Sequence, residues 1–202
     1  MILGFESLTR SYQILYSIFM TKFVLHGGFN KEKGFIKDEF FQEMLKDTPL
    51  DVKILFVFFA EREDLLQLRI EQGKEQFNKN KGSKNLNIKI ASKETFVEDC
   101  IWADIICIFG GRTVKLMEVL KKYKNLKELF NGKVIGGDSA GANALGQLFY
   151  SKSSKEIGEG LGILPFKVIV HYADDTPNPL ADIEPEIETL FLHEYETIVK
   201  SY

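Results

Sequence analysis

Residues 133–141 read KVIGGDSAG and join an expected buried strand to an expected helix through a turn of very small residues. The Gly-x-Ser-x-Gly pattern at such a junction is typical of a nucleophile elbow, a sharp turn that exposes a serine hydroxyl at the carboxyl edge of a parallel sheet. Gly137 and Gly141 allow the strand and the helix to pass closely, and the N-terminus of the helix directs N–H groups toward the same point. The stretch therefore predicts Ser139 as a nucleophile, with an idle serine in a glycine-rich turn as the alternative.

Outward from this turn, short apolar strands alternate with amphipathic helices along the chain. The apolar run KILFVFFA at 53–60 is typical of a central strand in a parallel sheet, because such strands are buried on both faces. The alternation predicts βαβ units with right-handed crossovers. We therefore expect an α/β fold in three layers, with a mostly parallel sheet and helices on both faces. The expected strands are 23–26, 53–60, 86–91, 104–109, 134–135, 167–171 and 190–193, and the expected helices are 35–45, 62–77, 95–102, 113–123 and one after residue 141.

The composition is that of a globular protein with a sizeable core, since 45% of the 202 residues are hydrophobic and 27% are charged. Lys and Arg number 26 against 29 Asp and Glu, so the basic excess of a nucleic-acid-binding protein is missing. No segment approaches the roughly 20 consecutive apolar residues of a membrane helix, and no membrane partner is expected.

A strand follows directly on Met20. Residues 1–19 are therefore interpreted as an N-terminal extension that need not be native, with an ordinary first helix as the alternative, and residues 20–202 as one domain.

The two cysteines, Cys100 and Cys107, both lie in apolar stretches. Two thiols are too few for a disulfide framework or a four-ligand zinc site, and no cluster of His, Cys and Asp has the spacing of metal ligands. The sequence therefore predicts a cytoplasmic protein that needs neither a metal nor another cofactor.

A serine nucleophile needs a base, and the chain offers only His26, His171 and His193. His171 ends the apolar strand VIVH, which predicts a place at the carboxyl edge of the sheet near Ser139, so it is the leading candidate. A structural or surface role is the alternative for each histidine.

The glycine pair at 110–111 also follows a strand and opens a helix, so its N–H groups are candidate donors to an oxyanion. A tight turn with no role in chemistry is the simpler interpretation of that pair.

Three motifs occur together in an order that resembles a known family. They are ICIFGGRT at 106–113, GDSAGA at 137–142, and GLGILP at 160–165 leading to His171-Tyr172. Together they resemble peptidase family S51, which includes aspartyl dipeptidase (peptidase E) and cyanophycinase, and the resemblance runs from about Phe23 to the C-terminus. It implies a three-layer fold of the class I glutamine amidotransferase-like or flavodoxin-like type, with serine instead of cysteine at the elbow.

The resemblance also implies an activity, that of a serine peptidase or amidohydrolase of the dipeptidase class acting on a small peptide or isopeptide amide. The nucleophile would be Ser139 and the base His171, and the family's third member, a glutamate after a late short strand, corresponds to Glu194. The implied oxyanion donors are the N–H groups of Gly111 and Ala140. No partner beyond the small peptide or amide is implied, and a monomer or a homodimer is expected. The alternatives for the glutamate are Glu196, Glu156 and Glu159.

Arg112 departs from the family pattern, which usually has asparagine after the two glycines. It is one of four arginines in a lysine-rich chain, and a guanidinium suits bidentate recognition of a carboxylate. Its position beside the expected oxyanion turn predicts that it binds a carboxylate of the substrate. A surface arginine at the start of a helix is the alternative.

Two other functions fit some of the same residues. The HGG sequence at 26–28 resembles the oxyanion loop of hormone-sensitive-lipase-like carboxylesterases, which would combine Ser139 with Asp182 and His193. The short spacing between Asp182 and His193 and the long gap from His26 to Ser139 argue against that family. The second alternative is a non-catalytic binding module on the same fold, in which Ser139 only hydrogen-bonds a ligand.

Overall fold

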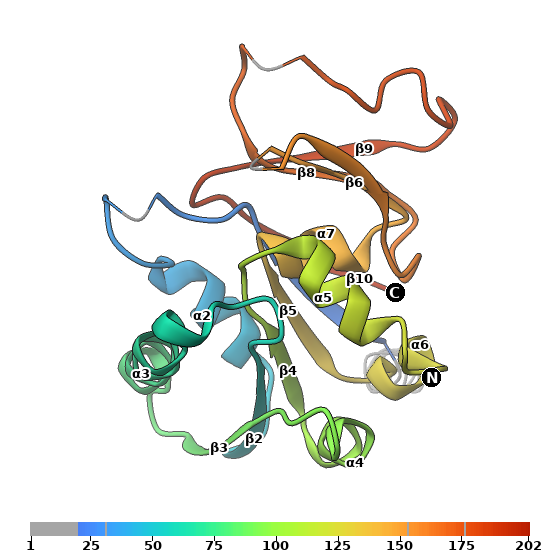
Figure 1. The fold of residues 1–202 in the computed structure, drawn as a ribbon. Coiled ribbons are helices and arrows are strands. Elements are labelled where there is room, and N and C mark those ends of the chain that lie inside the picture. Colours follow the sequence, from blue (N-terminus) through green and yellow to red (C-terminus); the bar gives the residue numbers. More distant parts are fainter. Residues whose placement is uncertain (1–19, 31, 153, 176) are drawn as a thin grey trace, which may run out of the picture.

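The larger of two sheets has six strands in the order β10-β1-β5-β4-β2-β3 (Figure 1). The computed structural model describes residues 20–202 apart from 31, 153 and 176, so the extension proposed at 1–19 lies outside the described residues. Neighbouring strands are parallel except at one edge, where β10 runs antiparallel to β1. The strands are β1 (Lys22–His26), β2 (Asp51–Val57), β3 (Asn85–Ile90), β4 (Ile105–Ile108), β5 (Val134–Asp138) and β10 (Thr197–Ser201).

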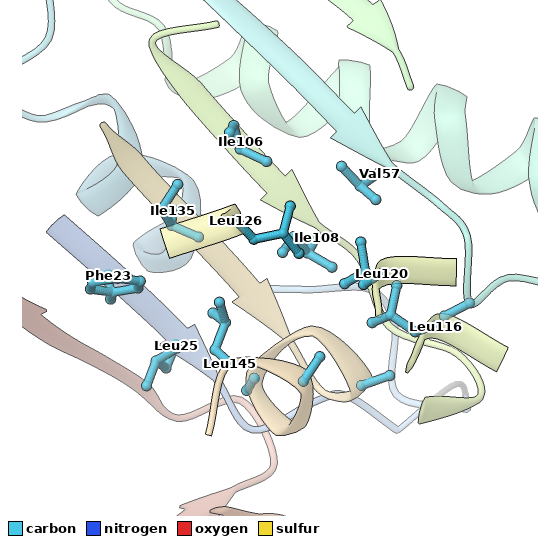
Figure 2. Packing of buried hydrophobic residues seen from close by; sticks show 14 of the residues in the cluster. Phe23, Leu25, Val57, Ile106, Ile108, Leu116, Leu120, Leu126, Ile135 and Leu145 are labelled. Carbon is cyan, nitrogen blue, oxygen red and sulfur yellow. The ribbon is translucent and has the colours of Figure 1, made fainter. Parts of the chain in front are cut away.

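Helices cover both faces of this sheet, because its strands carry apolar side chains on both sides. In β2, Ile54 and Phe56 face one apolar cluster, whereas Leu55 and Val57 face the other, because successive side chains of a strand point to opposite sides. Figure 2 shows the second cluster, in which Val57 and other strand residues pack against helical leucines. The arrangement confirms the predicted three-layer α/β fold. One face carries α2 (Asp38–Leu45) and α3 (Glu63–Asn80), and the other carries α4 (Phe96–Trp102), α5 (Thr113–Leu120), α6 (Leu126–Phe130) and α7 (Ala140–Leu145).

The core beneath α2 and α3 is built largely of phenylalanine. Phe41 and Phe77 are fully buried and meet edge to face at 5.1 Å, and burial of each such side chain contributes about 1.5–3 kcal/mol to stability. Gly136 makes room for this core, since a Cβ there would run into the side chain of Met44 on α2. The close packing of α2 on β5 fixes the strand that leads into the serine turn.

The second sheet has the order β7-β6-β8-β9 and lies beyond the carboxyl ends of the parallel strands of the first (Figure 1). The strands expected at 167–171 and 190–193 are present, but they belong to this smaller sheet, because an apolar run predicts burial and not the neighbouring strand. The other two strands were not expected, and β7 is almost entirely exposed, so it has no apolar pattern to detect. The four strands are β6 (Leu148–Ser151), β7 (Glu156–Glu159), β8 (Lys167–Tyr172) and β9 (Thr189–His193).

Helix length in the described ranges is modest. The longest helix there, α3, has 18 residues and begins with Glu63 and Asp64, as expected for a helix whose outer face meets solvent. Within the part of the chain that the structure describes, no helix has both the length and the apolar character needed to cross a membrane.

Both cysteines should be unreactive in the folded protein. Burial raises the pKa of the Cys100 thiol to about 12 and raises the pKa of Cys107 well above its usual value, and the thiolate is the reactive form. We expect iodoacetamide at neutral pH to leave the native protein unmodified and to alkylate both thiols once the protein is unfolded in guanidinium chloride. Intact-mass spectrometry measures the two outcomes. Rapid alkylation of the native protein would contradict the burial of these side chains.

Candidate active site

Ser139 lies in the turn between β5 and α7, at the carboxyl edge of the larger sheet. Its backbone has φ 47° and ψ −103°, a strained conformation for a residue with a side chain. The turn is fixed on both sides, because the Ser139 N–H donates to the carbonyl of His26 at 2.9 Å and the Ser139 carbonyl accepts from the N–H of Asn143 at 3.0 Å. A Cβ at Gly141 would overlap the carbonyl of Ile108, so only glycine allows α7 to pass β4 this closely.

The hydroxyl of Ser139 meets His171, which lies near the end of β8 in the second sheet. Ser139 Oγ is 3.0 Å from His171 Nε2, and His171 Nδ1 is 3.2 Å from Oε1 of Glu194. With the proton assigned to Nδ1, the imidazole donates to Glu194 and accepts from Ser139, which is the arrangement of a general base beside a nucleophile. The structure thus brings together the three residues that the sequence and the family resemblance singled out. The His171 and Glu194 side chains are 30% and 38% exposed, so this end of the site meets solvent.

The other candidate glutamates lie elsewhere. Glu196 is bonded to the ring of His193, with its Oε2 3.2 Å from Nδ1. Glu156 and Glu159 are the ends of β7, where Glu159 pairs with Lys121 at 3.7 Å. Of the four glutamates, only Glu194 is in hydrogen-bond contact with the ring of His171.

The two remaining histidines are engaged away from Ser139. His193 Nε2 lies 3.1 Å from Asp174, and the hydrogen bonds that its ring donates to Asp174 and Glu196 raise the pKa of His193. The esterase arrangement required Asp182 beside His193, and the structure does not form that contact. His26 is buried against the carboxylate of Asp138. Among the residues that the structure describes, no three His, Cys, Asp or Glu side chains are grouped so as to hold a metal ion.

Gly27 and Gly28 connect the two sheets at the site. The carbonyl of Gly27 accepts the N–H of His171 at 2.8 Å, and the carbonyl of Gly28 accepts the N–H of Tyr195 at 2.8 Å. Gly28 has φ 92°, and a Cβ on it would run into the imidazole of His171. A Cβ on Gly27 would overlap the carbonyl of His193. In the sequence this segment stood out only as a possible esterase loop. The signal that could have revealed its role is the pair of adjacent glycines directly after the first strand, which allows close backbone contact.

The second glycine pair passes directly beside Ser139, since a Cβ built on Gly110 would lie 3.3 Å from the Cβ of Ser139. The N–H groups flanking Gly111 are both engaged: Gly110 donates to Asp138 Oδ2 at 3.2 Å, and Arg112 donates to the carbonyl of Ala60 at 3.0 Å. Gly111 has φ 136°, and a Cβ on it would overlap the same carbonyl.

The N–H groups of Gly111 and Ala140 have no hydrogen-bond partner among the described residues, and Gly111 lines the same pocket as Ser139, which Ala140 directly follows. Ala140 is the first residue of α7, where backbone N–H groups have no acceptor within the helix. Two free donors beside a serine hydroxyl are what an oxyanion hole needs.

A pocket of about 490 Å³ opens at Ser139, His171 and Glu194, a volume within the usual range for small-molecule sites. All three arginines in the described part of the chain line it. Arg62 is bonded to Asp64, at 3.0 Å and 2.6 Å. Arg69 is nearly buried and bonds to Gln72 at 2.7 Å and to Glu61 at 3.5 Å.

Arg112 differs from the other two arginines of the pocket. Its side chain is exposed and has no hydrogen-bond or ion-pair partner among the described residues. Lys152 is a fourth cationic side chain in the pocket lining, where its Nζ lies 3.5 Å from the carbonyl oxygen of His171. Arg112 and Lys152 thus give the pocket that contains Ser139 two cations with no ion-pair partner among the described residues.

The chain belongs to peptidase family S51, whose family model matches residues 23–197, and membership in this family makes it a peptidase. Among solved structures it is similar to a peptidase from an acI-B1 Actinobacterium, with a TM-score of 0.62 and 22% identity over 92% of this chain and 85% of that one. It is also similar to a peptidase E protein from Listeria monocytogenes EGD-e, with a TM-score of 0.59 and 18% identity over 91% of this chain and 99% of that one. Both likenesses show the same fold. No curated protein matches the chain.

Replacement of Ser139 by alanine should abolish peptide hydrolysis and leave the fold intact, because it removes one hydroxyl and no core volume. Loss of a triad serine lowers kcat on the order of 10⁶-fold. His171→Ala should be nearly as damaging, whereas His193→Ala, the matched histidine control, should have a mild effect. Steady-state kinetics with acidic dipeptides and thermal unfolding of each variant measure these outcomes. Hydrolysis retained by Ser139→Ala, or an inactive His193→Ala beside an active His171→Ala, would contradict the assignment.

Proposed function

We propose that the protein is a serine peptidase of the dipeptidase class that hydrolyses the amide bond of a small acidic peptide or isopeptide. The observation that supports this most strongly is the hydrogen-bonded series from Ser139 through His171 to Glu194, with steps of 3.0 Å and 3.2 Å, at the mouth of a pocket. Membership in peptidase family S51 supports the same activity.

The first half of the reaction transfers the acyl group to serine. His171 Nε2 takes the hydroxyl proton as Ser139 Oγ attacks the carbonyl carbon, and the carbonyl oxygen becomes an oxyanion. The free N–H groups of Gly111 and Ala140 donate to that oxyanion. When the tetrahedral intermediate collapses, the C–N bond breaks and His171 gives its proton to the leaving amine.

The second half returns the enzyme to its starting state. His171 Nε2 takes a proton from a water molecule, which attacks the ester carbonyl of the acyl-enzyme, and then returns that proton to Ser139 Oγ as the acid product leaves. Glu194 accepts the Nδ1–H in both halves. It thereby holds the imidazole in the required tautomer and stabilises the cation that forms when Nε2 is protonated.

The charges of the pocket support an acidic substrate. The guanidinium of Arg62 faces the Asp64 carboxylate, and that of Arg69 has Glu61 beside it, so both are already neutralised. Arg112 follows the glycine turn beside Ser139 and keeps its donors free for a ligand. A pocket of about 490 Å³ has room for a dipeptide.

The two alternative functions receive less support from the site. An esterase of the hormone-sensitive-lipase type would need His193 at Ser139, and His193 is instead bonded to Asp174 and Glu196. A binding module has no need for a hydroxyl, an imidazole and a carboxylate in one hydrogen-bonded series. These contacts favour the peptidase.

A screen of purified protein against dipeptides tests the proposal. We expect release of a free amine from peptides with an N-terminal aspartyl residue, and much slower release from the matched asparaginyl peptides, which have the same shape without the charge. The failure of every dipeptide and isopeptide to be cleaved would argue for the binding module. Faster cleavage of simple carboxyl esters than of any amide would argue for the esterase.

Arg112→Lys should raise KM for acidic substrates and change the kinetics of neutral ones much less. A lysine keeps the charge but loses the planar pair of donors, and a hydrogen bond to a charged group contributes about 1.5–3 kcal/mol, which bounds the effect. Steady-state kinetics with paired aspartyl and asparaginyl peptides measure the difference.

Arg62→Lys is the matched control, because Arg62 lines the same pocket but is bonded to Asp64. We expect this variant to keep the KM of the unaltered protein for both substrates. Equal kinetics for acidic and neutral substrates in Arg112→Lys would show that Arg112 does not select the carboxylate.

A further inference from the structure

Asp138, the residue before the nucleophile, is buried together with His26. Their exposed fractions are 1% and 0%, and an ionisable group at that depth normally has a specific partner. The two residues are direct neighbours in the parallel register of β1 and β5. Neither is part of the series formed by Ser139, His171 and Glu194, so the reaction itself does not explain them.

One carboxylate joins three strand ends at this point. Oδ1 of Asp138 lies 2.7 Å from Nδ1 of His26 at the end of β1, and Oδ2 accepts the N–H of Gly110, 3.2 Å away in the turn after β4. Asp138 itself ends β5. The side chain therefore links the turn that carries Gly111 to the turn that carries Ser139 and Ala140.

These links hold the two free N–H groups relative to each other. Gly110, which is bonded to Asp138, comes directly before Gly111, and Ser139, whose N–H is bonded to the His26 carbonyl, comes directly before Ala140. His26 thus anchors the serine turn through its backbone and the Asp138 carboxylate through its ring. Misplacement of donors by a fraction of an ångström weakens stabilisation of a transition state.

The chemistry of the pair requires a carboxylate. We assign the proton of His26 to Nδ1, because the 2.7 Å contact with a carboxylate is shorter than the 3.2 Å contact between the Gly28 N–H and the same atom. Asp138 then faces two donors, one on each oxygen. Asparagine has the same shape but only one acceptor oxygen, so its NH₂ group would point at either the His26 or the Gly110 N–H.

His26 is poorly placed to relieve that conflict. Its Nε2 is buried and has no partner among the described residues, so moving the proton there would bury an unsatisfied donor.

We infer that Asp138 and His26 are positioning residues for the oxyanion hole, and that the carboxylate sets the distance between the N–H groups of Gly111 and Ala140. The inference rests on the proposed function, since it assigns a task only if an oxyanion forms at Ser139. Its distinguishing consequence is a loss of transition-state stabilisation without a matching loss of substrate binding.

The test compares Asp138→Asn with the unaltered protein on an aspartyl dipeptide. Removal of one oxyanion donor lowers kcat by about 10²–10³-fold, so displacement of one donor should lower kcat toward ~10²-fold and leave KM nearly unchanged. A peptide aldehyde, which forms a tetrahedral adduct with a serine, should lose affinity by the same factor, while the product acid keeps its affinity. Equal losses for aldehyde and product, or an unchanged kcat, would overturn the inference.

Asp99→Asn is the matched control, because Asp99 is also largely buried and accepts hydrogen bonds, from Thr95 at 2.7 Å and Lys89 at 3.4 Å, but lies on α4, which contributes no residue to the pocket lining. This variant should lower the stability of the fold but leave the ratio of aldehyde affinity to product affinity unchanged. If Asp138→Asn does not fold, His26→Gln serves instead. It leaves the hydrogen bond between Asp138 and Gly110 in place. We therefore expect aldehyde affinity to fall relative to product affinity, but by a smaller factor.

The rate of reaction with a serine-directed phosphonate separates this inference from the proposed function. Slower phosphonylation of Asp138→Asn than of Asp99→Asn supports the positioning role even if no dipeptide is cleaved. Equal rates in the two variants would refute it, whatever the natural substrate is. Absence of phosphonylation in the unaltered protein would overturn both the inference and the proposed peptidase.

Discussion

The backbone of Gly27 and Gly28 is the constraint on which the candidate site depends. These two residues follow the first strand of the larger sheet, and their carbonyls accept the N–H groups of His171 in the second sheet and of Tyr195 in the turn after β9, each at 2.8 Å. The contact is possible only without side chains, since a Cβ on Gly28 would occupy the place of the His171 ring. The bond to His171 therefore holds the end of β8, which carries the imidazole, against the segment that directly follows β1. The 3.0 Å contact between Ser139 and His171 follows from this junction.

Each sheet supplies part of the candidate site. The larger sheet carries Ser139 and both turns with free N–H groups, at the ends of neighbouring strands where a parallel sheet gathers ligand-binding residues. The smaller sheet carries His171 and leads into the turn with Glu194. The strained backbone at Ser139 persists because rigid elements hold it on both sides. Arg112 also lines the pocket, and its side chain has no hydrogen-bond or ion-pair partner among the described residues.

The sequence predicted the layered fold and the serine turn well, because both depend on local patterns of apolar and small residues. It did not predict that 167–171 and 190–193 belong to a separate sheet, since an apolar strand looks the same whichever neighbour it pairs with. Glu194 came from the family resemblance and not from any pattern of its own. The bond between His26 and Asp138 joins residues 112 positions apart, and only the register of the first and fifth strands brings them together. Sequence reasoning therefore singled out Ser139 and did not identify the glycines and the buried pair that hold its turn in place.

The central claim is that the hydroxyl of Ser139 is a nucleophile activated by His171. The most direct measurement is to treat the purified protein with a serine-directed phosphonate, digest it and identify the modified peptide by mass spectrometry, with His171→Ala treated in parallel. We predict one adduct, on Ser139, that forms quickly in the unaltered protein and very slowly in His171→Ala. No adduct, an adduct on another serine, or equal rates in the two proteins would contradict the claim.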